Sequence, residues 1–304
     1  MQEGESESEL NIANYDVAIV GRALDDRGRS AVNFLAHKSV KVVTIEYDPD
    51  EFKLDIDGTK LHADDFETFL VSLKRKSIIL ESTTLGFVEM FLCCRALWNL
   101  GATGLSFLYV EPLNYSLRET TFNRSQVLHK RDFGLSVEVP GYKAIPGATL
   151  ILTDRVPQRT VFFLGYEERR LDRALEDHQM IQPSSCSVVF GVPAFKPGWE
   201  MDAFANNIRV IKERNIRGGI HFCGAENPAS AIEVLNKISQ ELVPGERLFI
   251  GPIGTKPMGV GVALFASTRP NVGVLYDHPK RREKRSSNVA RWHLYEIEFQ
   301  TIPL

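Results

Sequence analysis

The chain has 304 residues, enough for one large hydrophobic core or two ordinary ones, and its 43% hydrophobic and 25% charged content is typical of a globular protein. A formal net charge of -3 at pH 7 gives no overall positive field, which argues against a general affinity for nucleic acid or membranes. The acidic first residues do not resemble a signal peptide, and no apolar run is long enough to cross a bilayer. We expect residues 1–13 to form a disordered acidic tail and the chain to have no membrane span.

Cysteine usage indicates a reducing compartment. Cys93 and Cys94 lie in an apolar helical run, Cys186 begins an apolar strand run, and Cys223 follows another. None of the four has the CxxC or histidine spacing of a zinc site, so we expect buried free thiols rather than metal ligands. The sequence therefore predicts a cytoplasmic protein without a metal or a cofactor.

Short apolar runs alternate with helix-like stretches along most of the chain, which is typical of an α/β protein with mostly parallel sheets. Within residues 14–113 we expect strands at 16–20, 40–46, 78–80 and 105–110 and helices at 29–36, 63–74 and 85–100. Within residues 159–304 we expect strands at 161–164, 187–190, 219–222, 248–250, 272–275 and 293–299 and helices at 170–178, 201–214, 228–242 and 257–266. Residues 114–158 contain Pro, Gly and β-forming residues, and they predict a small β-rich connector, either a plain linker or a lid.

The two halves repeat an order of sequence signals. The first strand of each ends in glycine before an acidic-acidic-arginine turn, Gly21 then Asp25-Asp26-Arg27 and Gly165 then Glu167-Glu168-Arg169. A later strand leads to a threonine-bearing turn that opens a helix, with Thr83-Thr84 in one half and Gly254-Thr255-Lys256 in the other. The next strand ends in Tyr-x-x-Pro, at 109–112 and 276–279. This shared order predicts two related Rossmann-like halves joined by the connector.

Strand-to-helix loops of open α/β sheets gather at the carboxyl ends of the strands, where such sheets bind ligands. Helix N-termini there offer backbone N–H groups and a partial positive charge, which suit phosphate. The candidate ligand-binding residues are Asp25, Arg27, Thr83, Thr84, Gly165, Glu167, Glu168, Arg169, Gly254, Thr255 and Lys256. Lys256 is the strongest of them because it adds a positive charge to a helix start, although an exposed lysine in a tight turn explains it as well. Helix capping is the favoured explanation of the carboxylates, since acidic side chains are favoured at a helix N-terminus.

The turn Gly254-Thr255-Lys256-Pro257-Met258, between an apolar strand and a helix of small residues, resembles the CARF family of Rossmann-like sensor domains associated with CRISPR systems. Many members carry a Gly-Thr-Lys-x-Met turn in that position. The resemblance implies that this turn and the loop after the first strand face a bound cyclic oligonucleotide, and that two domains join their loops into one pocket. Two such units in one chain would be similar to the SAVED domain of nucleotide-sensing antiviral effectors. The first half departs from the motif, with Thr83-Thr84-Leu85 where Thr-Lys would stand.

Two other groups of polar residues resemble binding sites less closely than they resemble ordinary loops. His221, Cys223 and Glu226 follow a strand without a second His or Cys at metal spacing, so we interpret them as loop residues rather than a zinc site. The basic run Lys280, Arg281, Arg282, Lys284 and Arg285 has no aromatic residues within it, and we interpret it as a solvated loop rather than a nucleic-acid site.

Three functions stay open at this point. The first is a sensor or regulatory subunit that binds a nucleotide, such as a cyclic oligonucleotide of bacterial antiviral defence, and signals to a protein partner or within a homodimer. The second is an enzyme that hydrolyses or transfers a phosphorylated nucleotide-type substrate, although no nucleophile elbow or paired metal motif is present. The third is a structural subunit of a multiprotein complex without a small-molecule ligand.

Overall fold

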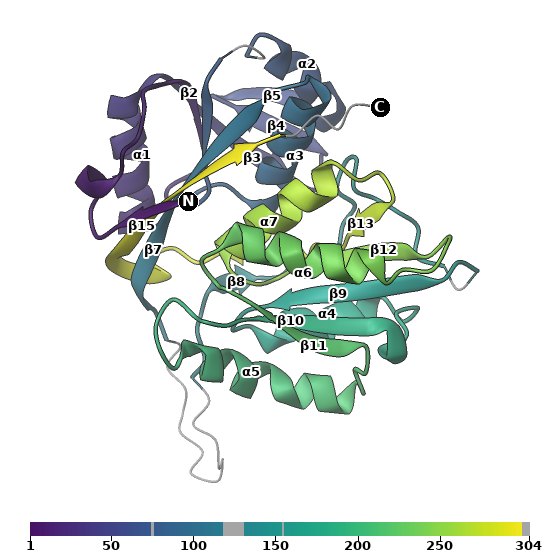
Figure 1. The fold of residues 1–304 in the computed structure, drawn as a ribbon. Coiled ribbons are helices and arrows are strands. Elements are labelled where there is room, and N and C mark those ends of the chain that lie inside the picture. Colours follow the sequence, from purple (N-terminus) through teal and green to yellow (C-terminus); the bar gives the residue numbers. More distant parts are fainter. Residues whose placement is uncertain (74–75, 118–130, 154, 300–304) are drawn as a thin grey trace. The chain divides into compact units, whose positions relative to one another are not determined.

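The computed structural model describes residues 1–304 except 74–75, 118–130, 154 and 300–304, and it contains two compact units (Figure 1). Unit 1 comprises Met1–Tyr115 and Glu283–Leu304, and unit 2 comprises Ser116–Arg282. Both units contain helices and strands in alternation, which confirms the α/β class. No helix of the described residues has the length and apolarity that a membrane span requires.

Unit 1 is built on a mixed eight-stranded sheet with the order β1-β15-β7-β6-β2-β3-β4-β5. Its strands are β1 (Gln2–Gly4), β2 (Tyr15–Val20), β3 (Ser39–Asp48), β4 (Lys53–Ile56), β5 (Thr59–His62), β6 (Ile78–Glu81), β7 (Gly104–Tyr115) and β15 (Ser286–Glu298). Its helices are α1 (Asp26–Lys38), α2 (Phe66–Val71) and α3 (Phe87–Asn99), with 3-10 turns at Glu7–Glu9 and Ala63–Asp65. The neighbours β3, β2, β6 and β7 run parallel, whereas the strands outside them are antiparallel.

The two ends of unit 1 differ from the expected domain limits. Residues 1–13, expected to be a disordered tail, contain β1, which pairs with β15, and they bury Leu10 and Ile12 in the core. Burial of these two side chains and backbone pairing at a sheet edge together order an otherwise acidic segment. The strand expected at 293–299 belongs to β15, which pairs antiparallel with β7 and buries Trp292 and Leu294, so residues 283–304 join unit 1 rather than the second half.

A hairpin in unit 1 was missed by the sequence interpretation. β4 and β5 pair antiparallel and are joined by Asp57 and Gly58, both with positive φ (49° and 86°). An Asp-Gly pair between alternating residues is the usual signal for such a turn, and it was available in the sequence. The helix expected at 63–74 is shorter, since a 3-10 turn precedes α2 (Phe66–Val71).

Unit 2 is built on a fully parallel five-stranded sheet with the order β11-β10-β9-β12-β13. The strands of that sheet are β9 (Gln158–Leu164), β10 (Cys186–Gly191), β11 (Gly219–Cys223), β12 (Arg247–Pro252) and β13 (Val272–Val274). A separate two-stranded sheet consists of β8 (Ser136–Glu138) and β14 (Lys280–Arg281). The helices of unit 2 are α4 (Glu168–Asp177), α5 (Trp199–Glu213), α6 (Pro228–Gln240) and α7 (Lys256–Ser267), with a 3-10 turn at Pro183–Ser185. The packed pairs α4 with α5 and α6 with α7 leave the central strands nearly inaccessible to solvent (Figure 1).

The expected connector belongs to unit 2 from Ser116 onward. In its described part, β8 pairs antiparallel with β14, the first residues of the basic run, and Lys280 forms an ion pair with Glu138 at 2.9 Å. Residues 148–153 contain no strand, and 118–130 lie outside the described residues. The four cysteines are free and buried, as expected from their apolar surroundings.

The packing of α6 against α7 depends on Gly261. A Cβ atom at this position would lie 2.5 Å from the carbonyl oxygen of Pro228 and 2.9 Å from the Cβ of Ala231. We expect Gly261→Ala to lower the free energy of unfolding by about 1–3 kcal/mol through overpacking. The same change in an unhindered helix interior gains about 1 kcal/mol.

Chemical denaturation followed by circular dichroism measures the change, with Glu233→Ala on the exposed face of α6 as the control. A stability of Gly261→Ala equal to or above that of the unaltered protein would contradict this account of the helix contact.

Candidate functional site

The switch point of the unit 2 sheet lies between β9 and β12. These neighbouring parallel strands lead through α4 to β10 on one side and through α7 to β13 on the other. The loops that follow them therefore diverge, and the divergence marks the place where open parallel sheets bind ligands. Of the predicted residues, Gly165 stands in the first loop, and Gly254, Thr255 and Lys256 stand in or next to the second.

The two switch-point loops approach each other closely because both carry glycine. A Cβ atom at Gly165 would lie 3.0 Å from the carbonyl oxygen of Ile253 and 3.6 Å from the Cα of Gly254. A Cβ atom at Gly254 would lie 2.7 Å from the Met258 sulfur. The structure thus brings together three of the predicted positions, Gly165, Gly254 and the adjacent Thr255. The missing side chains of the two glycines allow the two loops to approach each other closely.

Thr255 caps α7. Its hydroxyl accepts a hydrogen bond from the Met258 N–H at 3.4 Å and donates one to the Ala225 carbonyl at 2.6 Å, while its own N–H donates to the Met258 sulfur at 3.4 Å. Proline follows at position 257 and contributes no N–H. Thr255 therefore anchors the turn to the loop after β11, and the half-buried Lys256 is the residue that brings positive charge to this helix start.

The loop after β9 presents its predicted residues in different ways. The Glu167 carboxylate accepts hydrogen bonds from the Ser136 N–H at 3.0 Å and the Ser136 hydroxyl at 2.9 Å, so it holds β8. Glu168 lies 3.8 Å from the guanidinium of Arg209, whereas Arg169 is exposed. Glu167 thus has a structural partner, and Arg169 is an exposed cation in the first turn of α4.

Three residues that support this loop were missed by the sequence interpretation. Arg170, buried in the first turn of α4, donates two hydrogen bonds to Asp277 at 2.7 and 2.5 Å. Asn207 donates to the Gly165 carbonyl at 2.8 Å, and the buried Asn206 donates to the Tyr166 carbonyl at 2.9 Å. The Tyr-x-x-Pro signal that contains Asp277 was visible in the sequence, but the contact joins positions 107 residues apart.

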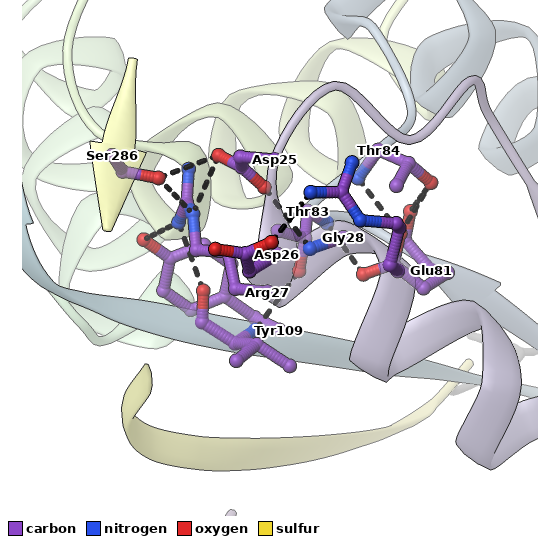
Figure 2. A network of polar contacts seen from close by, with 11 residues as sticks. Asp25, Asp26, Arg27, Gly28, Glu81, Thr83, Thr84, Tyr109 and Ser286 are labelled. Atoms are coloured by element: carbon purple, nitrogen blue, oxygen red, sulfur yellow. Dashed lines mark hydrogen bonds and ion pairs between the residues drawn. The ribbon is translucent and has the colours of Figure 1, made fainter. Parts of the chain in front are cut away.

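In unit 1, Asp25 and Arg27 form a buried ion pair at the start of α1 (Figure 2). The Arg27 guanidinium donates to Asp25 at 3.1 Å, to the Ser286 hydroxyl at 2.9 Å and to the Val110 carbonyl at 2.9 Å. The other Asp25 oxygen accepts the Gly28 N–H at 3.0 Å and caps the helix. Burial raises the pKa of Asp25, but Arg27 and Ser286 outweigh it and hold the pKa below its ordinary value.

Thr83 and Thr84 belong to a second buried network in unit 1, centred on Glu81 (Figure 2). The Glu81 carboxylate accepts the N–H groups of Thr83 at 2.9 Å and Thr84 at 2.7 Å and a contact from the Thr84 hydroxyl. The Thr83 hydroxyl accepts the Val110 N–H at 2.9 Å, and the Thr84 hydroxyl accepts the Gly21 N–H at 2.9 Å. Burial raises the pKa of Glu81 above its ordinary value.

Val110 links the two networks that contain the four predicted residues of unit 1. Its N–H donates to Thr83, and its carbonyl accepts from Arg27. All four are buried and hydrogen-bonded within the unit, which assigns them to the scaffold (Figure 2). Across the described residues, no group of three His, Cys, Asp or Glu side chains is arranged to hold a metal ion. The switch-point loops of unit 2 are the candidate site that is left.

Replacing Asp25 by asparagine leaves the buried Arg27 without its counter-charge. We expect Asp25→Asn to lower the free energy of unfolding at pH 7 by about 3–5 kcal/mol, as for other buried pairs that lose one partner. Because the folded-state pKa of Asp25 is lowered, its stabilisation is present above its unfolded value and is lost as the pH falls below about 4.

Urea denaturation at pH 7 and at progressively lower pH measures this difference. Asp26→Asn is the matched control, because Asp26 is an exposed neighbour paired with exposed Arg29. Equal losses for the two variants at pH 7 would refute the assignment of Asp25 to the scaffold.

Glu81→Gln tests the second network through its pH dependence. Because burial raises the folded-state pKa of Glu81, its contribution is most favourable below the unfolded value of about 4.3 and declines as the pH rises through the folded value. We expect the unaltered protein to lose stability relative to Glu81→Gln between pH 4 and pH 7, with exposed Glu46→Gln as the control. A stability difference that stays constant over this range would contradict the prediction.

No protein-family model matches the chain, and none of the curated proteins matches it. The candidate site is therefore defined by geometry alone. That geometry is a parallel switch point with two glycine-bearing loops, a threonine-capped helix start and the cations Lys256 and Arg169.

Proposed function

We propose that the chain is a nucleotide-binding sensor or regulatory subunit whose ligand lies at the switch-point loops of unit 2. The observation that carries the proposal is the strand order β11-β10-β9-β12-β13, which sets the loops at Gly165 and Gly254 against each other at the carboxyl edge of the sheet. Lys256 and Arg169 supply positive charge there, and the starts of α4 and α7 supply helix dipoles of the same sign. Together these features suit a phosphate group.

The ligand class follows from the resemblance to CARF and SAVED proteins. The Gly254 to Met258 turn, which carries the resemblance, opens α7 after β12. A cyclic oligonucleotide of bacterial antiviral defence is the proposed ligand, and a protein partner receives the signal. Site residues from the first half are left out of this proposal, since Asp25, Arg27, Thr83 and Thr84 serve the scaffold of unit 1.

Two related Rossmann-like halves remain part of the proposal, and the sheet orders support them. The parallel strands β3-β2-β6-β7 of unit 1 have the same chain order as β10-β9-β12-β13 of unit 2. The helix after β2 is α1, and the helix after β9 is α4. Each of these helices has a buried arginine in its first turn, and that arginine contacts the last of the four parallel strands or the residues after it. Arg27 binds the Val110 carbonyl of β7, and Arg170 binds Asp277 after β13.

Isothermal titration calorimetry with cyclic di-, tri- and tetranucleotides tests the site. We expect one member of the panel to bind the unaltered protein and Lys256→Ala to weaken that binding roughly 10- to 100-fold, the effect of losing one charge-assisted hydrogen bond. Lys237→Ala is the control, because Lys237 is exposed in the last turn of α6.

The absence of any binding to folded, unaltered protein would overturn the nucleotide assignment. An equal loss for Lys256→Ala and Lys237→Ala would remove the ligand from the switch-point loops.

A further inference from the structure

One face of unit 2 exposes apolar side chains from two adjoining elements. On α5, Met201 and Ile208 are 62% and 46% exposed, and with Phe204 between them they follow the spacing of one helix face. On β11, Ile220 and Phe222 are 47% and 52% exposed and lie on one side of the strand. These five residues form the α5–β11 face. Large exposed apolar side chains gathered on neighbouring elements mark interaction surfaces.

The α5–β11 face is continuous because Phe204 bridges its two elements. The Phe204 ring stacks on Phe190 of β10 with 4.2 Å between centroids and lies 6.0 Å from the ring of Phe222 on β11. Phe204 therefore sits over the space between β10 and β11. In the described part of the sheet β11 is an edge strand with β10 as its neighbour, so its outer backbone groups face away from the sheet.

We propose that the α5–β11 face is the interface of a symmetric homodimer, in which β11 pairs antiparallel with β11 of a second copy. A two-fold axis perpendicular to the sheet joins the two sheets edge to edge and places both α5 helices on the same side. Neighbouring strands lie about 4.8 Å apart, so helices centred between β10 and β11 in each copy are separated by about two strand spacings, or about 9.6 Å. Packed helices prefer about 8–10 Å. One axis thus satisfies the strands and the helices together.

The side-chain pattern is self-complementary about this axis. With His221 at the centre of the five-residue β11 on the axis, Ile220 of one copy faces Phe222 of the other. The two α5 helices then run antiparallel, and Met201 near the start of one approaches Ile208, just past the middle of the other. A stable interface buries about 800 Å² on each partner, and the proposed arrangement adds the contact between the helices to the pairing of the strands.

Charges at the ends of α5 favour the same occupant. Glu200 lies in the first turn of the helix and Lys212 lies in the last. The last residue, Glu213, is paired with Arg209 of the same helix, so Lys212 is the cation of that turn that Glu200 of the mate approaches in the antiparallel pair. A second copy therefore meets both the apolar centre of the face and its charged rim.

Sedimentation or light scattering across a concentration series tests the dimer. We expect the unaltered protein to be dimeric, and Phe222→Asp and Ile208→Glu each to raise the dimer dissociation constant at least about 30-fold, the effect of losing an interface hot spot. Val243→Asp is the matched control, because Val243 is 55% exposed in unit 2 but lies outside this face. A monomeric unaltered protein, or a dimer that the two variants leave intact, would overturn the proposal.

A cysteine at position 221 tests the register without placing a charge on the face. Directly opposed residues of antiparallel strands have Cα atoms about 4.5–5.5 Å apart, within the range that a disulfide spans. We expect His221→Cys to form a covalent dimer under mild oxidation that reductant reverses, and Val243→Cys to stay monomeric on a denaturing gel. The four native cysteines are buried. Failure of folded His221→Cys to cross-link would exclude the proposed strand pairing.

Discussion

A buried arginine guanidinium connects the first helix of each unit to the last of that unit's parallel strands or to the residues after it. Arg27 reaches from α1 to Asp25, Ser286 and the carbonyl of Val110, and Arg170 reaches from α4 to Asp277. A buried cation is costly unless it is paired and hydrogen-bonded, so Arg27 is held by three segments and Arg170 by the paired carboxylate of Asp277. In both units this contact joins the start of a helix to the last parallel strand or to the residues that follow it.

The polar residues near the two arginines differ between the units in their burial. Around Arg27, the polar side chains at the strand ends bond to one another, and the network with Glu81, Thr83 and Thr84 lies within the same buried region (Figure 2). In unit 2, Arg170 and Asp277 bond to each other, while Arg169 and Lys256, in the first turns of α4 and α7, retain solvent access. The predicted residues of unit 1 are therefore all engaged inside the unit, whereas unit 2 keeps two predicted cations within reach of solvent.

The sequence predicted the parallel strands and most of the helices because their signals are local. The apolar runs of β9, β10 and β12 and the Asn-Pro start of α6 identify themselves within a few residues. The partners of Asp25 and Glu167 were beyond reach, because Ser286 and Ser136 lie 261 and 31 residues away and only the fold brings them close. The sequence shows only that a polar residue stands at a strand end. It does not show whether a ligand or another loop forms the hydrogen bonds of that residue.

The pairing of β15 with β7 has a consequence for how the protein is made. Residues on either side of unit 2 complete the sheet of unit 1, so unit 2 interrupts unit 1 in the chain. During synthesis β7 leaves the ribosome before unit 2, and its partner β15 emerges only after unit 2 is complete. Unit 2 has all its strands while the β7 edge is still open, so the nascent chain carries an unpaired strand edge for the time that about 170 residues take to be translated. The sheet of unit 1 is therefore completed only after its last strand in the chain, β15, has been synthesised.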